Sequence, residues 1–139
     1  APHLRFEGPY QAADLPAHYA DVHFSWCIDY YEEGHNSAWL LPNRLYESAA
    51  HLAVPIALAG VETGRFLRAH DLGLVVDRTN LDSLVALFAG MTDERHARLR
   101  RALAEAPPDL WRAGPEECRR LVAAITGREG EALWPRVAR

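Results

Sequence analysis

Polar side chains gather ahead of a helix that is predicted to open near residue 43. Asn36, Ser37, Asn43 and Arg44 supply hydrogen-bond donors there, next to helix amides that have no partner within the helix. Helix N-termini of this kind attract anions. Arg44 strengthens the case, because a cation in the first turn opposes the helix dipole unless a bound negative group compensates it. The pattern therefore predicts an anion-binding site.

Glu47 follows one helical turn later, on the same side as Arg44. A carboxylate at this position could accept two hydrogen bonds from the neighbouring hydroxyls of a ribose. Two simpler explanations stay open: Glu47 is a solvated helix residue, or it pairs with Arg44 in a surface contact worth about a few tenths of a kcal/mol. The spacing alone does not choose among the three.

Short apolar runs alternate with helical patterns in the first part of the chain, which is typical of an α/β fold. Four strands are predicted, at 4–6, 21–29, 54–58 and 73–77. Helices are predicted at 14–20, from 42 through the apolar stripe Leu45, Ala49 and Leu52, and at 64–69. About four strands joined by helical crossovers make a three-layer, Rossmann-like parallel sheet. Ligands bind such sheets at the carboxyl ends of the strands, which here are residues 8–10, 29–37, 59–60 and 77.

The remainder of the chain is predicted to be helical, at 81–91, at 92–106 and again after 114–117. In the last of these helices Leu121, Val122 and Ile125 are expected to face inward. We therefore expect one domain over residues 1–139, with an α/β part at 1–90 and a helical C-terminal tail at 91–139.

Composition narrows the function classes. A length of 139 residues, 49% hydrophobic residues and a net charge of −4 are those of a folded domain. The 15 basic residues are dispersed, which argues against a nucleic-acid partner. Cys27 and Cys118 lie far apart and the seven histidines form no metal-binding pair, so we expect neither a disulfide nor a metal. With no membrane-span run and no signal sequence, the chain is expected to be cytoplasmic.

Several stretches, taken in order and spacing, resemble a known family. They are FEGPY (6–10), LPNRLYESAA (41–50), VPIAL (54–58) and GLVVD (73–77). Over roughly the first 90 residues the chain resembles the nucleotide-sugar half of retaining glycosyltransferases with two Rossmann-like domains, the GT-B type. The resemblance implies a nucleoside-diphosphate sugar as donor substrate, a glycan or lipid-linked acceptor, and no further cofactor.

Roles for individual residues follow from the resemblance. It implies that Glu47 holds the ribose, that Asn43, Arg44 and the amide of Leu45 face the diphosphate, and that Gly8-Pro9-Tyr10 lies against the base. The nearby Asn36 and Ser37 belong to the same nucleotide-sugar site. Arg44 would be a catalytic residue, because a fixed guanidinium stabilises the charge that develops on the leaving diphosphate.

The sequence departs from the family in two respects. The position eight residues before Glu47, often a glutamate in the family, is Trp39, so a sugar-contacting catalytic carboxylate would come from Glu32 or Glu33, and we assign Glu33. The length leaves no room for an acceptor domain or for the first two strands of a complete donor domain, which indicates a fragment. The strand at 4–6 would then pair directly with a neighbour, or a second chain in a homodimer would fill the gap. Peripheral membrane contact would lie in the absent domain.

The function expected from these observations is sugar transfer from a nucleoside-diphosphate sugar during synthesis of a bacterial surface polysaccharide. The alternative is a non-catalytic or degenerate α/β domain that serves assembly. A receiver-like domain is disfavoured because the chain has no lysine, and a flavodoxin-like domain because residues 7–11 are not a Ser/Thr-rich phosphate loop.

Overall fold

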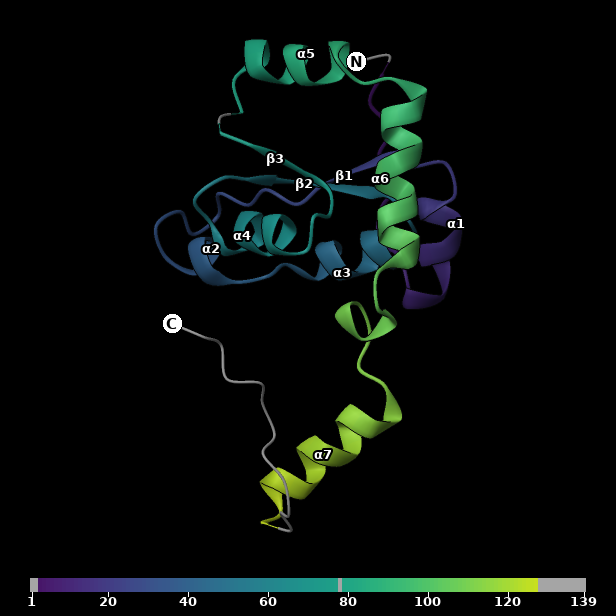
Figure 1. The fold of residues 1–139 in the computed structure, drawn as a ribbon, viewed down its shortest axis with the longest axis vertical. Coiled ribbons are helices and arrows are strands. Elements are labelled where there is room, and N and C mark those ends of the chain that lie inside the picture. The colour runs from purple at the N-terminus through teal and green to yellow at the C-terminus, as the bar shows by residue number, and fades with distance from the viewer. Residues whose placement is uncertain (1–2, 78, 128–139) are drawn as a thin grey trace. The chain divides into compact units, whose positions relative to one another are not determined.

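Three parallel strands form the central sheet in the computed structural model, which describes residues 3–77 and 79–127. They are β1 (Phe24–Trp26), β2 (Val54–Leu58) and β3 (Leu74–Val76), and β2 lies in the middle (Figure 1). Trp26 is opposite Ile56, which in turn is opposite Leu74. The α/β class and the parallel sheet are therefore confirmed.

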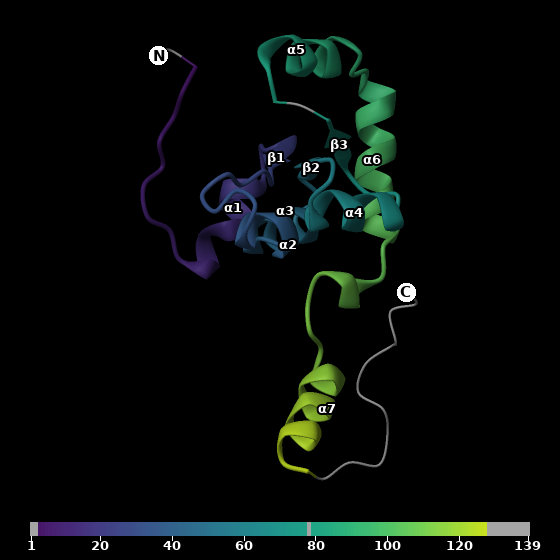
Figure 2. The same cartoon turned by 90° about the vertical axis from the view of Figure 1, so that its left-hand side faces the viewer.

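Helices cover both faces of the sheet. Ahead of β1 are the short η1 (Ala12–Asp14) and α1 (Leu15–Tyr19), and between β1 and β2 are α2 (Asn36–Trp39) and α3 (Asn43–Ala50). After β2 comes α4 (Glu62–Ala69), and after β3 come α5 (Leu81–Ala89) and α6 (Asp93–Glu105). Figure 2 shows α3 and α4 on one side of the strands and α5 on the other.

Side chains of β1 identify what packs on each face. Ser25 and Cys27 are buried on the side of α3, where Arg44 and Ser48 influence the Cys27 thiol. Phe24 points the other way, since successive strand residues face opposite sides, and its ring contacts those of Phe88 on α5 and His96 on α6. The fold thus has three layers, with the sheet between two sets of helices.

The core is built around β2. Its residues 54–57 are buried, and Leu45 and Ala49 of α3 and Leu67 of α4 pack as buried residues beside it. Gly64 in the first turn of α4 lies so close to β2 that a Cβ there would be 2.2 Å from the carbonyl oxygen of Leu58. The absence of a side chain at Gly64 therefore lets the start of α4 reach the carboxyl end of β2.

Two expectations about the sheet are corrected. Residues 4–6 form no strand, and Leu4 and Phe6 are 80% and 91% exposed. The sheet has three strands and not about four, because this short run offers two apolar side chains around Arg5, which pairs with Glu7, too little to hold a strand at the sheet edge. The strand expected at 21–29 narrows to 24–26.

The chain divides into two units, Ala1–Ala106 and Pro107–Arg139. Helix α6 packs on β2 and lies in the first unit, together with the sheet. In the second unit η2 (Pro108–Leu110) precedes α7 (Pro115–Ile125). Residues 128–139 of the expected tail lie outside the described residues.

Helix α7 corrects a further expectation. Leu121, Val122 and Ile125 are 59%, 60% and 77% exposed, so they do not face inward. The helix also carries the ion pairs Glu116 with Arg119 and Glu117 with Arg120. The predicted helix is present, and no residue of its own unit that the structure describes covers its apolar stripe.

Candidate functional site

A pocket of about 310 Å³ lies at the carboxyl ends of β1 and β2. Its lining comes from the residues that follow β1, from the end of β2, and from the segments that lead into α3 and α4. The lining residues include Cys27, Ile28, Asp29, Ser37, Leu40, Asn43, Leu58, Val61 and Thr63. The pocket is therefore at the sheet edge where ligands of parallel α/β folds bind.

Two helix N-termini meet at this pocket. Helix α3 begins at Asn43 and α4 at Glu62, and the amides that open a helix have no acceptor within its regular i to i−4 pattern; in α3 the amide of Leu45 donates instead to the carbonyl of Pro42. Thr63, 2% exposed, donates its hydroxyl to the carbonyl of Leu40 at 3.4 Å and so ties α4 to the segment after α2. Asp29, Ser37 and Asn43 add polar groups to a lining that is otherwise largely apolar. The pocket can hold a ligand with an anionic part and a less polar part.

Arg44 lies beside the pocket without lining it. Its guanidinium donates to the carbonyl of Ile28, a pocket residue, at 3.4 Å. Its charge also acts on Cys27, whose pKa it lowers slightly against the larger effect of burial. Arg44 and Glu47 form no ion pair in the described chain, so the surface-pair explanation for Arg44 is wrong.

Glu47 lies one turn further along α3, half-buried and near the phenol of Tyr19. Burial is the main cause that raises the pKa of Tyr19, and the charge of Glu47 and the neighbouring Tyr10 raise it further. Tyr10 packs its ring edge-on against His18 of α1, with ring centroids 5.5 Å apart. Tyr19 is thus influenced by Tyr10 and by Glu47, and Glu47 is one helical turn from Arg44 on α3.

Only some of the remaining predicted residues line the pocket. Ser37 and Asn43 line the pocket. Leu45 is fully buried in the core, and its amide donates to the carbonyl of Pro42 at 2.9 Å, so this amide is engaged by the helix itself. The side-chain amide of Asn36 is held by the Glu32 carboxylate. Like Asn36 and Leu45, the predicted residues Glu33, Gly8, Pro9 and Tyr10 do not line the pocket.

Two residues of the site have no place in the sequence-based prediction. Tyr19 is predicted only as part of a short helix, although it lies in the stretch that precedes the resembling motif. Cys27 is predicted as strand core, and it is indeed 3% exposed, but it also lines the pocket. Its position at the end of a predicted strand is the signal that could place it at the ligand edge.

Burial raises the pKa of the Cys27 thiol, and this effect outweighs the lowering by Ser25, Ser48 and Arg44. The thiolate is the reactive species. We therefore expect iodoacetamide to alkylate the exposed Cys118 at neutral pH and Cys27 far more slowly, with the Cys27 rate rising only as the pH climbs above the ordinary thiol pKa. Peptide mass spectrometry over a pH series measures both rates. Equal rates at neutral pH would show that Cys27 is neither buried nor shifted.

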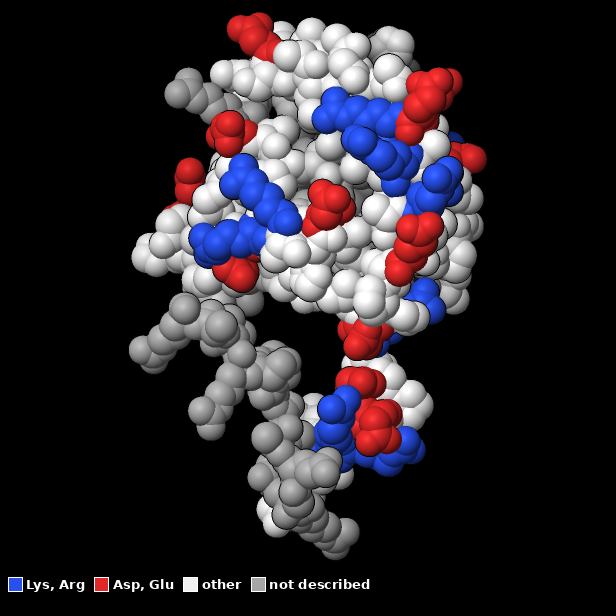
Figure 3. Space-filling model, viewed as in Figure 1, with Lys and Arg blue, Asp and Glu red and all other residues white. Residues whose placement is uncertain are grey.

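The described residues contain no group of three or more His, Cys, Asp or Glu side chains that could hold a metal ion. Within the same residues, no helix is both long and apolar enough to span a bilayer. On the face seen in Figure 3, arginines and acidic residues are interspersed and form no basic stripe.

Comparison with known proteins finds a curated relative. The chain is 43% identical over 125 residues to the succinoglycan biosynthesis protein ExoL of Rhizobium meliloti (strain 1021). The match takes in 89% of this chain and 31% of ExoL, so the chain spans about a third of the relative's length. No protein-family model matches the sequence, and no solved structure matches it significantly.

Proposed function

We propose that the chain is the nucleotide-sugar-binding part of a glycosyltransferase that acts in bacterial polysaccharide synthesis. The observation that carries the proposal is an order of polar residues that ends at the pocket: Tyr19, whose pKa both Tyr10 and Glu47 raise, then Glu47 and Arg44 on α3, then Asn43 at the pocket. This order matches the order of parts in a nucleoside-diphosphate sugar. The similarity to ExoL, a protein named for succinoglycan biosynthesis, supports the polysaccharide context.

Each part of the donor has a matching group in this arrangement. The base lies near Tyr10, and the half-buried Glu47 accepts hydrogen bonds from the ribose hydroxyls. The diphosphate is held by the N-terminus of α3 and by Arg44. The sugar enters the pocket, where Asp29 and Ser37 supply acceptors and donors for its hydroxyls.

Catalysis in this proposal is electrostatic. As the bond between sugar and diphosphate breaks, negative charge grows on the departing phosphate oxygens. The guanidinium of Arg44 and the first amides of α3 are already oriented by the fold, so they stabilise that charge with little reorganisation. The sugar passes to the oxygen of an acceptor hydroxyl, the proton of that hydroxyl goes to the departing phosphate oxygen, and the nucleoside diphosphate leaves.

Arg44→Ala tests the diphosphate contact. We expect this change to weaken binding of a nucleoside diphosphate by about tenfold or more, as for loss of a hydrogen bond to a charged group, and to leave binding of the nucleoside nearly unchanged. Calorimetric titration with both ligands measures the two losses. Arg98→Ala on α6, an exposed arginine away from the pocket, serves as the control. An equal loss for nucleoside and diphosphate contradicts the assigned role.

A second candidate function is non-catalytic assembly with a second copy of the chain. The exposed stripe Leu121, Val122 and Ile125 of α7 favours it, because apolar side chains at helical spacing commonly pack against a partner. Sedimentation over a concentration series distinguishes the two functions. A dimer that Val122→Asp dissociates, in a chain that binds no nucleotide, would support assembly alone.

A further inference from the structure

Large aromatic side chains are exposed between β1 and α3. Tyr31 is 93% exposed and Trp39 is 61% exposed, and Tyr30 between β1 and Tyr31 is 44% exposed. Burying a tryptophan or tyrosine ring is among the larger favourable contributions that a side chain makes to folding. Rings left in solvent next to a pocket therefore indicate a surface that binds something.

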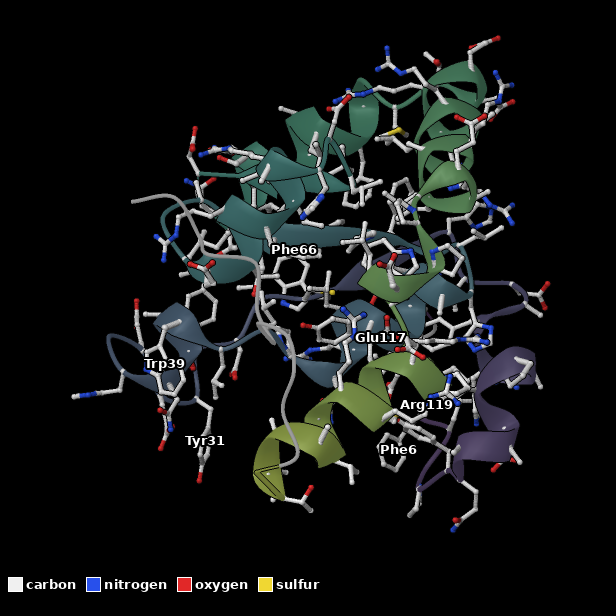
Figure 4. All side chains as sticks on the ribbon, turned by 60° about the horizontal axis from the view of Figure 1, so that its bottom comes forward. Phe6, Tyr31, Trp39, Phe66, Glu117 and Arg119 are labelled. Carbon is white, nitrogen blue, oxygen red and sulfur yellow. The ribbon has the colours of Figure 1, made fainter. Side chains whose placement is uncertain are left out.

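Hydrogen bonds hold Tyr31 and Trp39 at the two ends of one closed loop. The amide of Glu32 donates to the hydroxyl of Ser37 at 3.0 Å, and the amide of Ser37 donates back to the carbonyl of Glu32 at 3.3 Å. Next to this closure, the amide of Leu40 donates to the carbonyl of Asn36 at 2.9 Å, which fixes the backbone just after Trp39. Tyr31 and Trp39 thus flank the closure, and Figure 4 shows both side chains projecting outward from this end of the fold.

The aromatic pair is connected to the pocket through neighbouring residues, although neither ring lines it. The backbone amide of Tyr31 donates to the carboxylate of Asp29 at 2.9 Å, and Asp29 lines the pocket. Trp39 is followed by Leu40, which lines the pocket and accepts the Thr63 hydroxyl through its carbonyl. A ligand that extends out of the pocket past Asp29 or Leu40 therefore leads toward the loop that carries Tyr31 and Trp39.

Charge decides what kind of ligand fits. The segment 29–40 carries Asp29, Glu32 and Glu33, and the chain has no Lys or Arg from residue 6 to residue 43. The segment itself has no Lys or Arg that could pair with a negative charge on a ligand, whereas Arg44 offers one at the start of α3. An uncharged ligand that offers both apolar faces and hydroxyl groups is complementary, since aromatic rings pack on the first and carboxylates accept hydrogen bonds from the second.

We propose that Tyr31 and Trp39 form a stacking surface for the neutral sugar rings of an oligosaccharide. The faces of a pyranose ring that carry axial C–H groups pack flat on the indole and phenol rings, while the ring hydroxyls reach Asp29 and Glu33. Naming this oligosaccharide as the acceptor glycan rests on the proposed function; the binding of neutral sugar rings does not.

The test is binding of neutral tetrasaccharides to the 139-residue chain, with cellotetraose, maltotetraose and mannotetraose as probes and a hyaluronan tetrasaccharide as the anionic comparison. We expect at least one neutral probe to bind and the anionic one to bind more weakly. Trp39→Ala and Tyr31→Ala should each weaken binding roughly fivefold or more. Phe6→Ala, which removes an equally exposed aromatic outside this loop, should change nothing. Circular dichroism checks that each variant is folded.

The proposal is wrong if no neutral probe binds at about millimolar concentration, or if the Trp39→Ala and Tyr31→Ala variants bind the probe as well as the unmodified chain does. It is also wrong if both variants abolish self-association in sedimentation, because the rings would then contact a second copy of the chain. Glu47→Ala separates this proposal from the proposed function. Oligosaccharide binding that survives in a chain unable to bind nucleotides leaves the aromatic surface standing and removes the donor site. Nucleotide binding without oligosaccharide binding keeps the donor site and removes the aromatic surface.

Discussion

Leu45→Ala should lower the free energy of unfolding by about 2 to 5 kcal/mol, the range for a buried leucine truncated to alanine. Leu45 has no exposed surface and lies between α3 and the sheet. Its loss removes apolar contacts and leaves a cavity that the surrounding strands cannot fill. Because α3 carries Asn43, Arg44 and Glu47, loss of this contact also loosens the candidate site. Urea denaturation followed by circular dichroism measures the change.

The control for Leu45→Ala is Arg98→Ala, which removes an exposed side chain from α6. We expect that change to stay within about 0.5 kcal/mol, as for most surface substitutions. If Leu45→Ala is equally mild, then α3 is not anchored by Leu45, and the position assigned to the site residues on α3 is undermined.

Glu47→Ala should weaken nucleoside diphosphate binding while leaving the free energy of unfolding nearly unchanged, in contrast to Leu45→Ala. The carboxylate is half-buried and makes no ion pair in the described chain, so its removal leaves no charge unpaired. If Glu47 holds the ribose through charge-assisted hydrogen bonds, the change weakens nucleoside diphosphate binding by about 1.5 to 3 kcal/mol, or roughly 10- to 150-fold. Calorimetric titration of both proteins gives the difference.

Glu105→Ala, at the end of α6 and exposed, controls for the general loss of one negative charge. It should bind the diphosphate as the unmodified chain does. Unchanged affinity in Glu47→Ala would take Glu47 out of the binding site, whatever the behaviour of Arg44.

The helices and strands predicted best from sequence are those whose apolar side chains are buried in the core. The run 54–58 is apolar and forms β2 with those bounds. The stripe that contains Leu45 and Ala49 gives α3, with both side chains fully buried. In both cases, local pattern and tertiary environment agree, so local pattern suffices.

The failures have a common physical cause. The run 4–6 and the stripe of α7 both show side chains that favour burial, but a sequence pattern does not say what covers them. Phe6 is 91% exposed, and Ile125 is 77% exposed although its spacing predicts burial. A strand forms only beside another strand that accepts and donates its backbone hydrogen bonds, and an apolar helix stripe is buried only if another element packs on it. The local sequence specifies neither neighbour.

The candidate site is predictable to a similar degree. Ser37 and Asn43 are predicted from sequence, and both line the pocket. The aromatic pair Tyr31 and Trp39 is not, because its relation to the pocket depends on how Glu32 and Ser37 close the loop. The residue types at Glu32 and Ser37 do not by themselves predict the hydrogen bonds that close this loop.

Whether a nucleoside diphosphate lies along α3 is tested most directly by backbone NMR of the chain during titration with uridine, guanosine, adenosine and thymidine diphosphates. We expect one of these ligands to shift the amide signals of Asn43, Arg44 and Glu47, whose helix supplies the unpaired amides and the ribose contact. We also expect a shift at Tyr10. A folded chain in which none of the four ligands moves these signals, or in which the shifts fall on α6 instead, would contradict a donor site on α3.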